Sequence, residues 1–365
     1  MRLFPRRLVQ RYAAALAVIL VTGLATGLGG TPTLAVHNAG LFELDGDAMD
    51  QTPADSREDW DLQYHLAAGG SGSSAATART FVSEPPASDT TYFTGGGSKD
   101  VNDIPQWAYT TTSVPDKNEI TDAFASAYLQ DGELYLYFGL DRYSNDGDSA
   151  VGFWFFHNPV GLGAGGSFTG QHAPGDIFVT SELTGGGTVS SINVYEWVGG
   201  RRPLQLIATG RDCGDGGLQA GDLACGRVNG GPAPSPWPYV PKPNTGSAGT
   251  FPPVAFFEGG INISRALPGR SGCFTGFLAE TRSSQETTAQ LKDFALGSFA
   301  TCSARIRIAE DGVNAVGTPH TFTVTVEENH GSGFHPAPGA EVNSALGQGS
   351  VGAIVGGTCL TGTTD

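Results

Sequence analysis

The stretch Glu133 to Arg142 reads ELYLYFGLDR, and the stretch Ala150 to His157 reads AVGFWFFH. Both are rich in aromatic and aliphatic side chains, which favours strands. The second stretch is apolar almost throughout, as is typical of a strand that is covered on both faces. The residues between them, 144–148, read SNDGD, a turn sequence of the hairpin kind. We therefore expect two strands joined by a tight turn at the centre of the fold.

Further strands are predicted on both sides of this pair, with glycine-rich turns between several of them. They cover residues 41–46, 176–183, 189–198, 204–208, 255–263, 274–281 and 293–299. The chain holds 54 glycines and 22 prolines, which favours short strands joined by many turns. The sequence thus predicts a mostly β fold, a large jelly-roll-like β-sandwich with one short helix.

The one helix is predicted behind Pro115. Asp116 and Glu119 have the spacing of a capping box. Apolar residues then follow at i, i+3, i+4 and i+7, and these are Ile120, Ala123, Phe124 and Ala127. We expect this helix to pack on the sheet.

The N-terminus has the three parts of a secretory signal peptide. Four arginines and no acidic residue precede an apolar run from Tyr12 to about Leu28, and small residues follow it. The run is short for a membrane span and is broken by Thr and Gly. Residues 1–35 are therefore interpreted as a signal peptide of a secreted or extracellular protein, whether released or attached to the cell surface.

Charge excludes several partners. None of the 36 acidic residues and four of the 20 basic ones lie in residues 1–35, so the remaining chain has a net charge of −20. Such a chain repels nucleic acid and anionic membranes, which bind basic patches. No later segment is apolar enough for membrane insertion, and an unidentified glycan or surface protein is the expected partner.

Five cysteines are disulfide candidates in an exported chain. The simplest pairing joins Cys213 with Cys225 and Cys273 with Cys302, although the sequence leaves other pairings open. We expect the partner of Cys359 to lie beyond residue 365, in a longer protein. The cysteines have no zinc-ligand spacing.

The sequence texture changes after Cys302. Residues 304–309 and 320–326 alternate strictly, as strands with one buried face do. We predict a β-sandwich module over residues 36–302 and an incomplete immunoglobulin-like β-sandwich over residues 303–365.

Two resemblances support this division. Residues 319–326, Pro338-Gly339 and residues 357–359 are similar to the bacterial Ig-like repeats of invasin-type surface proteins. The larger module resembles a family of exported actinobacterial proteins in which it precedes Ig-like or prealbumin-like repeats. The motifs that carry this resemblance are FELDGDA, TGGGSKDVNDIPQW, VPDKNEITDAFASAY, LYLYFGLDRY, GFWFF, FFEGGIN and FLAETRSS. The resemblance implies no catalytic residues.

Acidic turns are the first candidate sites. Oxygen-rich clusters occur at Asp45, Asp47 and Asp50, at residues 100–103, and at residues 141–148. Ca²⁺ prefers such oxygen ligands, and sandwich domains often hold it between loops. If structural calcium is bound, Asp141, Asp146 and Asp148 are the preferred ligands. The alternative, which we favour, is that these residues simply build turns.

Carbohydrate chemistry is the second candidate. Glycosidases need two carboxyl groups about 5 to 9.5 Å apart, and Glu196, Glu258 and Glu280 lie on predicted strands. The plainer interpretation places them on solvated strand faces. Trp237 and Tyr239, in the proline-rich loop 229–253, form the aromatic pair most suited to sugar stacking, with packing as the favoured alternative.

These patterns include no convincing catalytic motif, because a nucleophile elbow and a phosphate-binding loop are both missing from the sequence. We expect a non-catalytic secreted or cell-surface modular protein, an adhesive or structural recognition module. The alternative is a carbohydrate-binding module or a glycoside hydrolase-like sandwich.

Overall fold

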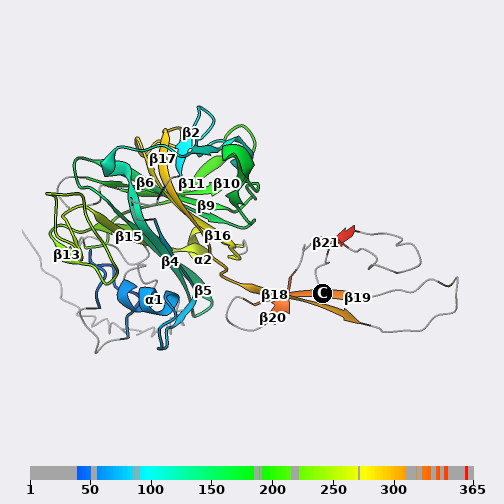
Figure 1. Cartoon of the computed structure of the whole chain (residues 1–365). Helices are drawn as coiled ribbons and strands as arrows, with labels where there is room; N and C mark the ends of the chain where they lie inside the picture. Colours follow the sequence, from blue (N-terminus) through cyan, green and yellow to red (C-terminus); the bar gives the residue numbers. More distant parts are fainter. Residues whose placement is uncertain are drawn as a thin grey trace, which may run out of the picture. The chain divides into compact units, whose positions relative to one another are not determined.

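Strands dominate the computed structural model (Figure 1). It describes residues 39–50, 56–84, 86, 89, 91–184, 189, 191–214, 222–269, 272–309, 318, 323–329, 334–337, 341–343 and 358–360. The described residues include two α-helices, α1 (Trp60–Ala67) and α2 (Ile263–Ala266). The predicted signal peptide, residues 1–35, lies outside them.

Two β-layers enclose the main core. One layer contains β1 (Ala76–Ser83), β4 (Ile120–Gln130), β5 (Glu133–Arg142), β15 (Phe256–Asn262) and β12 (Ala224–Val228). The other contains β10 (Ile192–Trp197), β9 (Ile177–Leu183), β6 (Ser149–Phe156), β16 (Gly276–Arg282), β17 (Leu291–Ser298), β2 (Tyr92–Thr94) and β3 (Ala108–Thr110). Strand β11 (Leu204–Asp212) links the layers, pairing with β10 in antiparallel and with β12 in parallel orientation. The prediction of a mostly β sandwich is confirmed.

The central strands are buried on both faces. Successive side chains of a strand point to opposite faces, so β4 sends Ala123, Ala125 and Ala127 into the core between the layers and Phe124 and Tyr128 outward. The outward residues are buried too, because loops and short elements cover both outer faces. This double covering explains the long apolar runs of β4, β5 and β6.

The predicted hairpin at residues 144–148 is wrong. Strand β5 pairs with β4 and β15, whereas β6 pairs with β9 and β16, so the turn connects opposite layers. The two strands meet through side chains across the core. The rings of Phe138 and Phe153 lie 4.8 Å apart, centroid to centroid.

The predicted helix behind Pro115 is also wrong. Residues Asp116–Asn118 form a single 3₁₀ turn without a side-chain cap, and β4 begins at Ile120. Apolar residues on both faces of a strand include positions at helical spacing, so the two periods could not be separated there. The longer α-helix is α1, capped by Asp59, whose side chain accepts a hydrogen bond from the backbone N–H of Trp60.

The cover over the β4–β5–β15 face comes from distant segments. It consists of the loop around Phe42, helix α1 and the proline-rich loop with β13 (Ala233–Pro234) and β14 (Thr250–Phe251). The predicted strand at residues 41–46 is replaced by a turn with one isolated bridge, Phe42 to Glu58. The opposite outer face is covered by Trp107 and by the hairpin of β7 (Gly161–Leu162) and β8 (Phe168–Thr169). The hairpin of β2 and β3 adds to this cover, since it joins the layer through a single residue pair, Tyr92 with Asp293.

The predicted disulfides, Cys213–Cys225 and Cys273–Cys302, are both present. After the second of them, β18 (Ser303–Ala309), β19 (Thr323–Asn329) and β20 (Phe334–Pro336) form a three-stranded antiparallel sheet. Strands β21 (Glu341–Asn343) and β22 (Thr358–Leu360) form a further pair. The alternating pattern after Cys302 therefore correctly predicts strands.

Replacing Phe153 by Ala tests the inter-layer core. Phe153 is fully buried and stacks on Phe257 with ring centroids 5.5 Å apart. We expect the Phe153→Ala variant to lose about 3–5 kcal/mol of unfolding free energy in urea titrations, because a cavity remains. The control, Leu206→Ala, changes a half-exposed side chain and should stay within about 0.5 kcal/mol of the wild type. Equal losses in both variants would contradict this account of the core.

Candidate functional site

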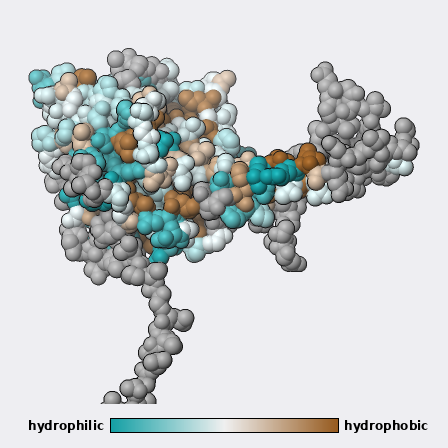
Figure 2. All heavy atoms as spheres, turned by 90° about the horizontal axis from the view of Figure 1, so that it is seen from below, coloured by the Kyte–Doolittle hydropathy of each residue, from teal (hydrophilic) through white to brown (hydrophobic). Residues whose placement is uncertain are grey.

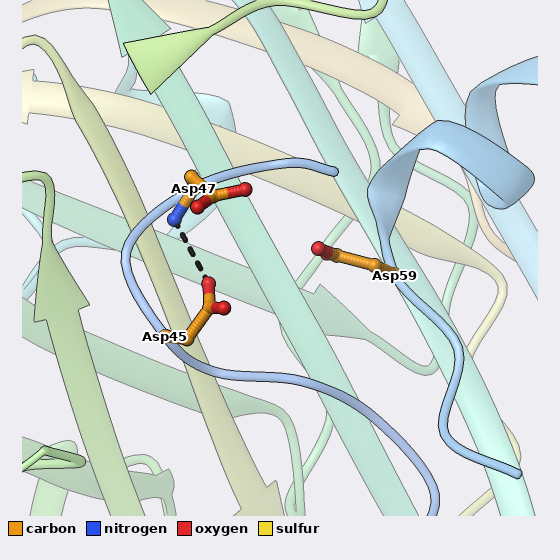
Figure 3. Close-up of side chains that lie close together, drawn as sticks. All are labelled: Asp45, Asp47 and Asp59. Atoms are coloured by element: carbon orange, nitrogen blue, oxygen red, sulfur yellow. Dashed lines mark hydrogen bonds between the residues drawn. The ribbon is translucent and has the colours of Figure 1, made fainter. Parts of the chain in front are cut away.

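Three carboxylates converge where the loop of residues 42–50 meets the start of α1. Asp45 and Asp47 lie in the loop, and Asp59 is the N-cap residue of the helix. Each offers one oxygen, and these oxygens all lie within 4.8 Å of one another. Figure 3 shows the Asp59 carboxylate extending toward the loop that carries the other two. We call this group the Asp45 cluster.

Short-range hydrogen bonds shape the loop. The backbone N–H of Asp47 donates to Asp45 Oδ1 at 3.1 Å, and that of Met49 donates to Asp47 Oδ1 at 2.9 Å. Gly46 between them has a φ of 94°, which a residue with a side chain rarely adopts. The sequence Asp-Gly-Asp therefore folds back on itself, with its carboxylates on one side of the turn (Figure 3).

Glu258 of β15 anchors the loop from beneath. Its Oε1 accepts from the backbone N–H of Gly46 at 2.7 Å, and its Oε2 accepts from the indole Nε1 of Trp60 at 3.0 Å. The side chain is fully buried. One carboxyl group thus ties the loop and helix α1 to the sheet.

Burial disfavours the ionised form of the carboxyl groups in the Asp45 cluster and of Glu258 beneath it. Desolvation, followed by the neighbouring Asp47, raises the pKa of Asp45 to about 6. Burial, followed by the charges of nearby carboxylates, raises the pKa of Asp59 and of Glu258 well above the usual range. The guanidinium of Arg227 donates to the backbone oxygen of Asp45 at 2.6 Å and only partly offsets the negative charge. A proton or a bound cation would relieve the repulsion among these carboxylates.

A second acidic group lies beside β4 and β17. Asp89, Glu119 and Asp293 each offer an oxygen within 4.8 Å of the others. Burial, then the charge of Asp89, raises the pKa of Glu119 to about 7 and that of nearby Glu84 to about 8. Asp293 accepts backbone N–H groups of Ile120 and Phe294 at 2.7 and 2.9 Å, so it also fixes the start of β4.

The preferred calcium ligands of the sequence do not converge. Asp141 is fully buried and accepts from Thr121 and from Trp237 Nε1, the latter at 2.8 Å. Asp146 is exposed and pairs with Lys242 at 2.7 Å, and Asp148 is exposed. These three are not among the carboxylate groups of the described residues whose oxygens lie within 4.8 Å.

The proposed ligand-stacking pair is not exposed. Trp237 and Tyr239 are 3% and 1% exposed and pack on the outer face of the β4–β5–β15 layer. The hydroxyl of Tyr239 donates to the backbone oxygen of Arg142 at 2.8 Å. Their burial agrees with the favoured alternative, that Trp237 and Tyr239 pack inside the fold and do not stack on a sugar.

The three strand-borne glutamates are buried on different faces. Glu258 lies on the outer face of one layer and Glu280 on the outer face of the other, since Phe257 and Ala279 next to them point into the shared core. Glu196 pairs with Ile177, a core residue, and so lies on an inner face. The expectation of solvated strand faces is wrong.

Sequence reasoning singled out Asp45 and Asp47 but missed Asp59. The available signal was an Asp before the helical stretch WDLQYHLA, which is a preferred N-cap. Its proximity to residue 45 depends on the tertiary fold. Comparisons with protein-family models, with curated proteins and with solved structures find no match to this chain.

The pH dependence of stability tests the burial of Glu84, which lies near the second acidic group. The pKa of Glu84 rises from 4.5 to about 8 on folding, so the folded chain retains a proton that the unfolded chain releases. Protonated Glu84 is therefore compatible with the folded state at low pH, and the free energy of unfolding declines as the pH rises toward 8. In EDTA, we expect Glu84→Gln to reduce the decline of unfolding free energy between pH 5 and 8 by roughly 1 kcal/mol per pH unit.

Asp131→Asn serves as the control, because Asp131 lies exposed in the turn between β4 and β5. This variant should follow the wild-type pH profile. A Glu84→Gln profile as steep as that of the wild type would contradict the assignment.

Proposed function

We propose that this chain is a non-catalytic, exported recognition module of adhesive or structural type. The observation that carries the proposal is the placement of Glu196, Glu258 and Glu280, which are 7%, 0% and 0% exposed. A glycosidase needs two carboxyl groups facing one accessible substrate. Glu258 and Glu280 face opposite sides of the sandwich, which disfavours the glycoside hydrolase alternative.

The closed faces of the sandwich leave loops and strand edges as recognition surfaces. Both outer faces are covered by the chain itself, and the aromatic residues suited to sugar stacking are used for that cover. A surface hollow of about 430 Å³ is lined by residues 101–102, 200–204 and 287–288. This geometry favours a partner that binds along the surface, a surface protein or an extended glycan.

The sheet of β18, β19 and β20 supports a modular architecture. Ile306 and Ile308, 64% and 69% exposed, lie opposite Val326 and Val324 and share one face with them. The other face carries Arg305 and Glu327, which form an ion pair at 2.6 Å. Hydrophobic and hydrophilic residues lie close together on the surface of this sheet (Figure 2). A sheet with one apolar face is typical of half a sandwich, in line with the resemblance to Ig-like repeats.

Two observations are compatible with an extracellular location. The structure contains two disulfides, which persist in oxidising compartments. Among the described residues, no helix is long and apolar enough to cross a membrane.

Export is tested with the full chain in a secreting bacterial host. We expect the protein to appear in the medium or on the cell surface with an N-terminus near residue 36, as measured by mass spectrometry, because residues 1–35 are removed. A chain that lacks residues 1–35 should stay in the cytoplasm. A full chain that keeps residues 1–35 would contradict the proposal.

The non-catalytic assignment is tested with a panel of polysaccharides. We expect saturable retention on at least one immobilised glycan or on whole bacterial cells, and no reducing ends above those of heat-denatured protein. Glu258→Gln and Glu280→Gln should leave the reducing-end signal unchanged, because neither carboxyl group reaches substrate. Reducing ends that the wild type releases and either variant does not would identify a hydrolase instead.

A further inference from the structure

We propose that Asp45, Asp47 and Asp59 bind one Ca²⁺ ion, which fastens the N-terminal loop to helix α1. This inference does not depend on the recognition role proposed above, because it concerns a structural ion. The residues come from two segments, the loop of residues 42–50 and the helix N-cap, which the ion would join.

A buried oxygen without a partner is the observation that points to a ligand. Asp59 is fully buried; its Oδ1 accepts the backbone N–H of Trp60 at 2.6 Å, while its Oδ2 has no hydrogen-bond partner. An unpaired buried carboxylate oxygen is costly in free energy. Asp59 reaches toward Asp45 and Asp47, whose oxygens are also acceptors (Figure 3). A cation would satisfy all three carboxylates at once.

The geometry and chemistry suit calcium. Ca²⁺ binds six to eight oxygens at roughly 2.3–2.6 Å, so two ligands of one ion lie at most about 5 Å apart. The three carboxylate oxygens, all within 4.8 Å of one another, meet this limit. The side of the cluster at Asp45 is exposed, so water can complete the coordination. Glu258 is engaged by Gly46 and Trp60 and supports the site from beneath.

The chain contains a matched comparison. Asp146-Gly147-Asp148 repeats the Asp-Gly-Asp sequence of residues 45–47, and Gly147 has a φ of 91°, close to that of Gly46. Asp146, however, is paired with Lys242, and this turn is not among the three-carboxylate groups of the described residues. The turn sequence is the same in both places, but of these two described turns only the first belongs to a group of three converging carboxylates.

Terbium luminescence provides a local readout in the intact chain. Tb³⁺ occupies calcium sites, and the indole of Trp60, next in sequence to Asp59, can transfer excitation energy to it. We expect tryptophan-sensitised Tb³⁺ emission that Ca²⁺ displaces. We also expect a rise of several degrees in the melting temperature with Ca²⁺ that EDTA reverses, since a ligand specific to the native state stabilises it.

Three variants localise the ion. Asp59→Asn should abolish the emission and the Ca²⁺-dependent melting shift; it retains the helix cap, because Asn is as good an N-cap as Asp. Asp45→Asn changes an exposed side chain and should weaken Tb³⁺ binding at least tenfold, which keeps the test valid if Asp59→Asn does not fold. The control, the double variant Asp146→Asn and Asp148→Asn, should bind as the wild type does.

Several results would overturn the proposal. One is a wild-type chain with neither sensitised emission nor a calcium-dependent melting shift. Another is loss of emission in the control variant with retention in Asp45→Asn, which would place the ion at residues 146–148. A larger melting shift with Mg²⁺ than with Ca²⁺ at equal concentration would overturn the choice of calcium.

Discussion

Burial of both faces of the central strands is the constraint on which the rest of this structure depends. Strands β4, β5, β6, β15 and β16 carry apolar side chains toward the shared core and also away from it. The outward residues need covers of their own, because a large apolar face in contact with water costs free energy. Helix α1, the proline-rich loop and the β2–β3 hairpin supply those covers.

The same constraint explains the buried acids. Strand residues beneath a cover lose water, so each carboxylate there needs a donor or a proton. Indole N–H groups fill this role three times: Trp60 donates to Glu258, Trp237 to Asp141 and Trp154 to Asp100, at 3.0, 2.8 and 3.0 Å. Asp100 also pairs with the buried Arg282 at 2.6 Å. Donors do not reach every buried carboxylate oxygen: one oxygen of Asp59 and both of Glu280 have no hydrogen-bond partner.

Several elements could be predicted from local sequence. Strand β5 matches its predicted bounds, and β6, β9, β15, β16 and β17 lie within a few residues of theirs, because aromatic and β-branched runs have few other stable conformations. Local sequence failed as a guide at β4, because the apolar residues of a strand with two buried faces also occur at helical spacing. It failed again at residues 144–148, since a turn sequence does not say whether the next strand stays in the same layer.

The sequence by itself determined the β class, the positions of most strands and an acidic turn at residues 45–47, and it made Cys213–Cys225 and Cys273–Cys302 the simplest of several possible disulfide pairings. These follow from residue type, spacing and neighbours close along the chain. Only the tertiary structure decided which strands face each other, which aromatics become covers, and that Asp59 and Glu258 meet the loop of residues 42–50. Glu258 and Gly46 are 212 residues apart along the chain. Contacts at that separation depend on how the two layers and their covers pack, and no local pattern encodes them.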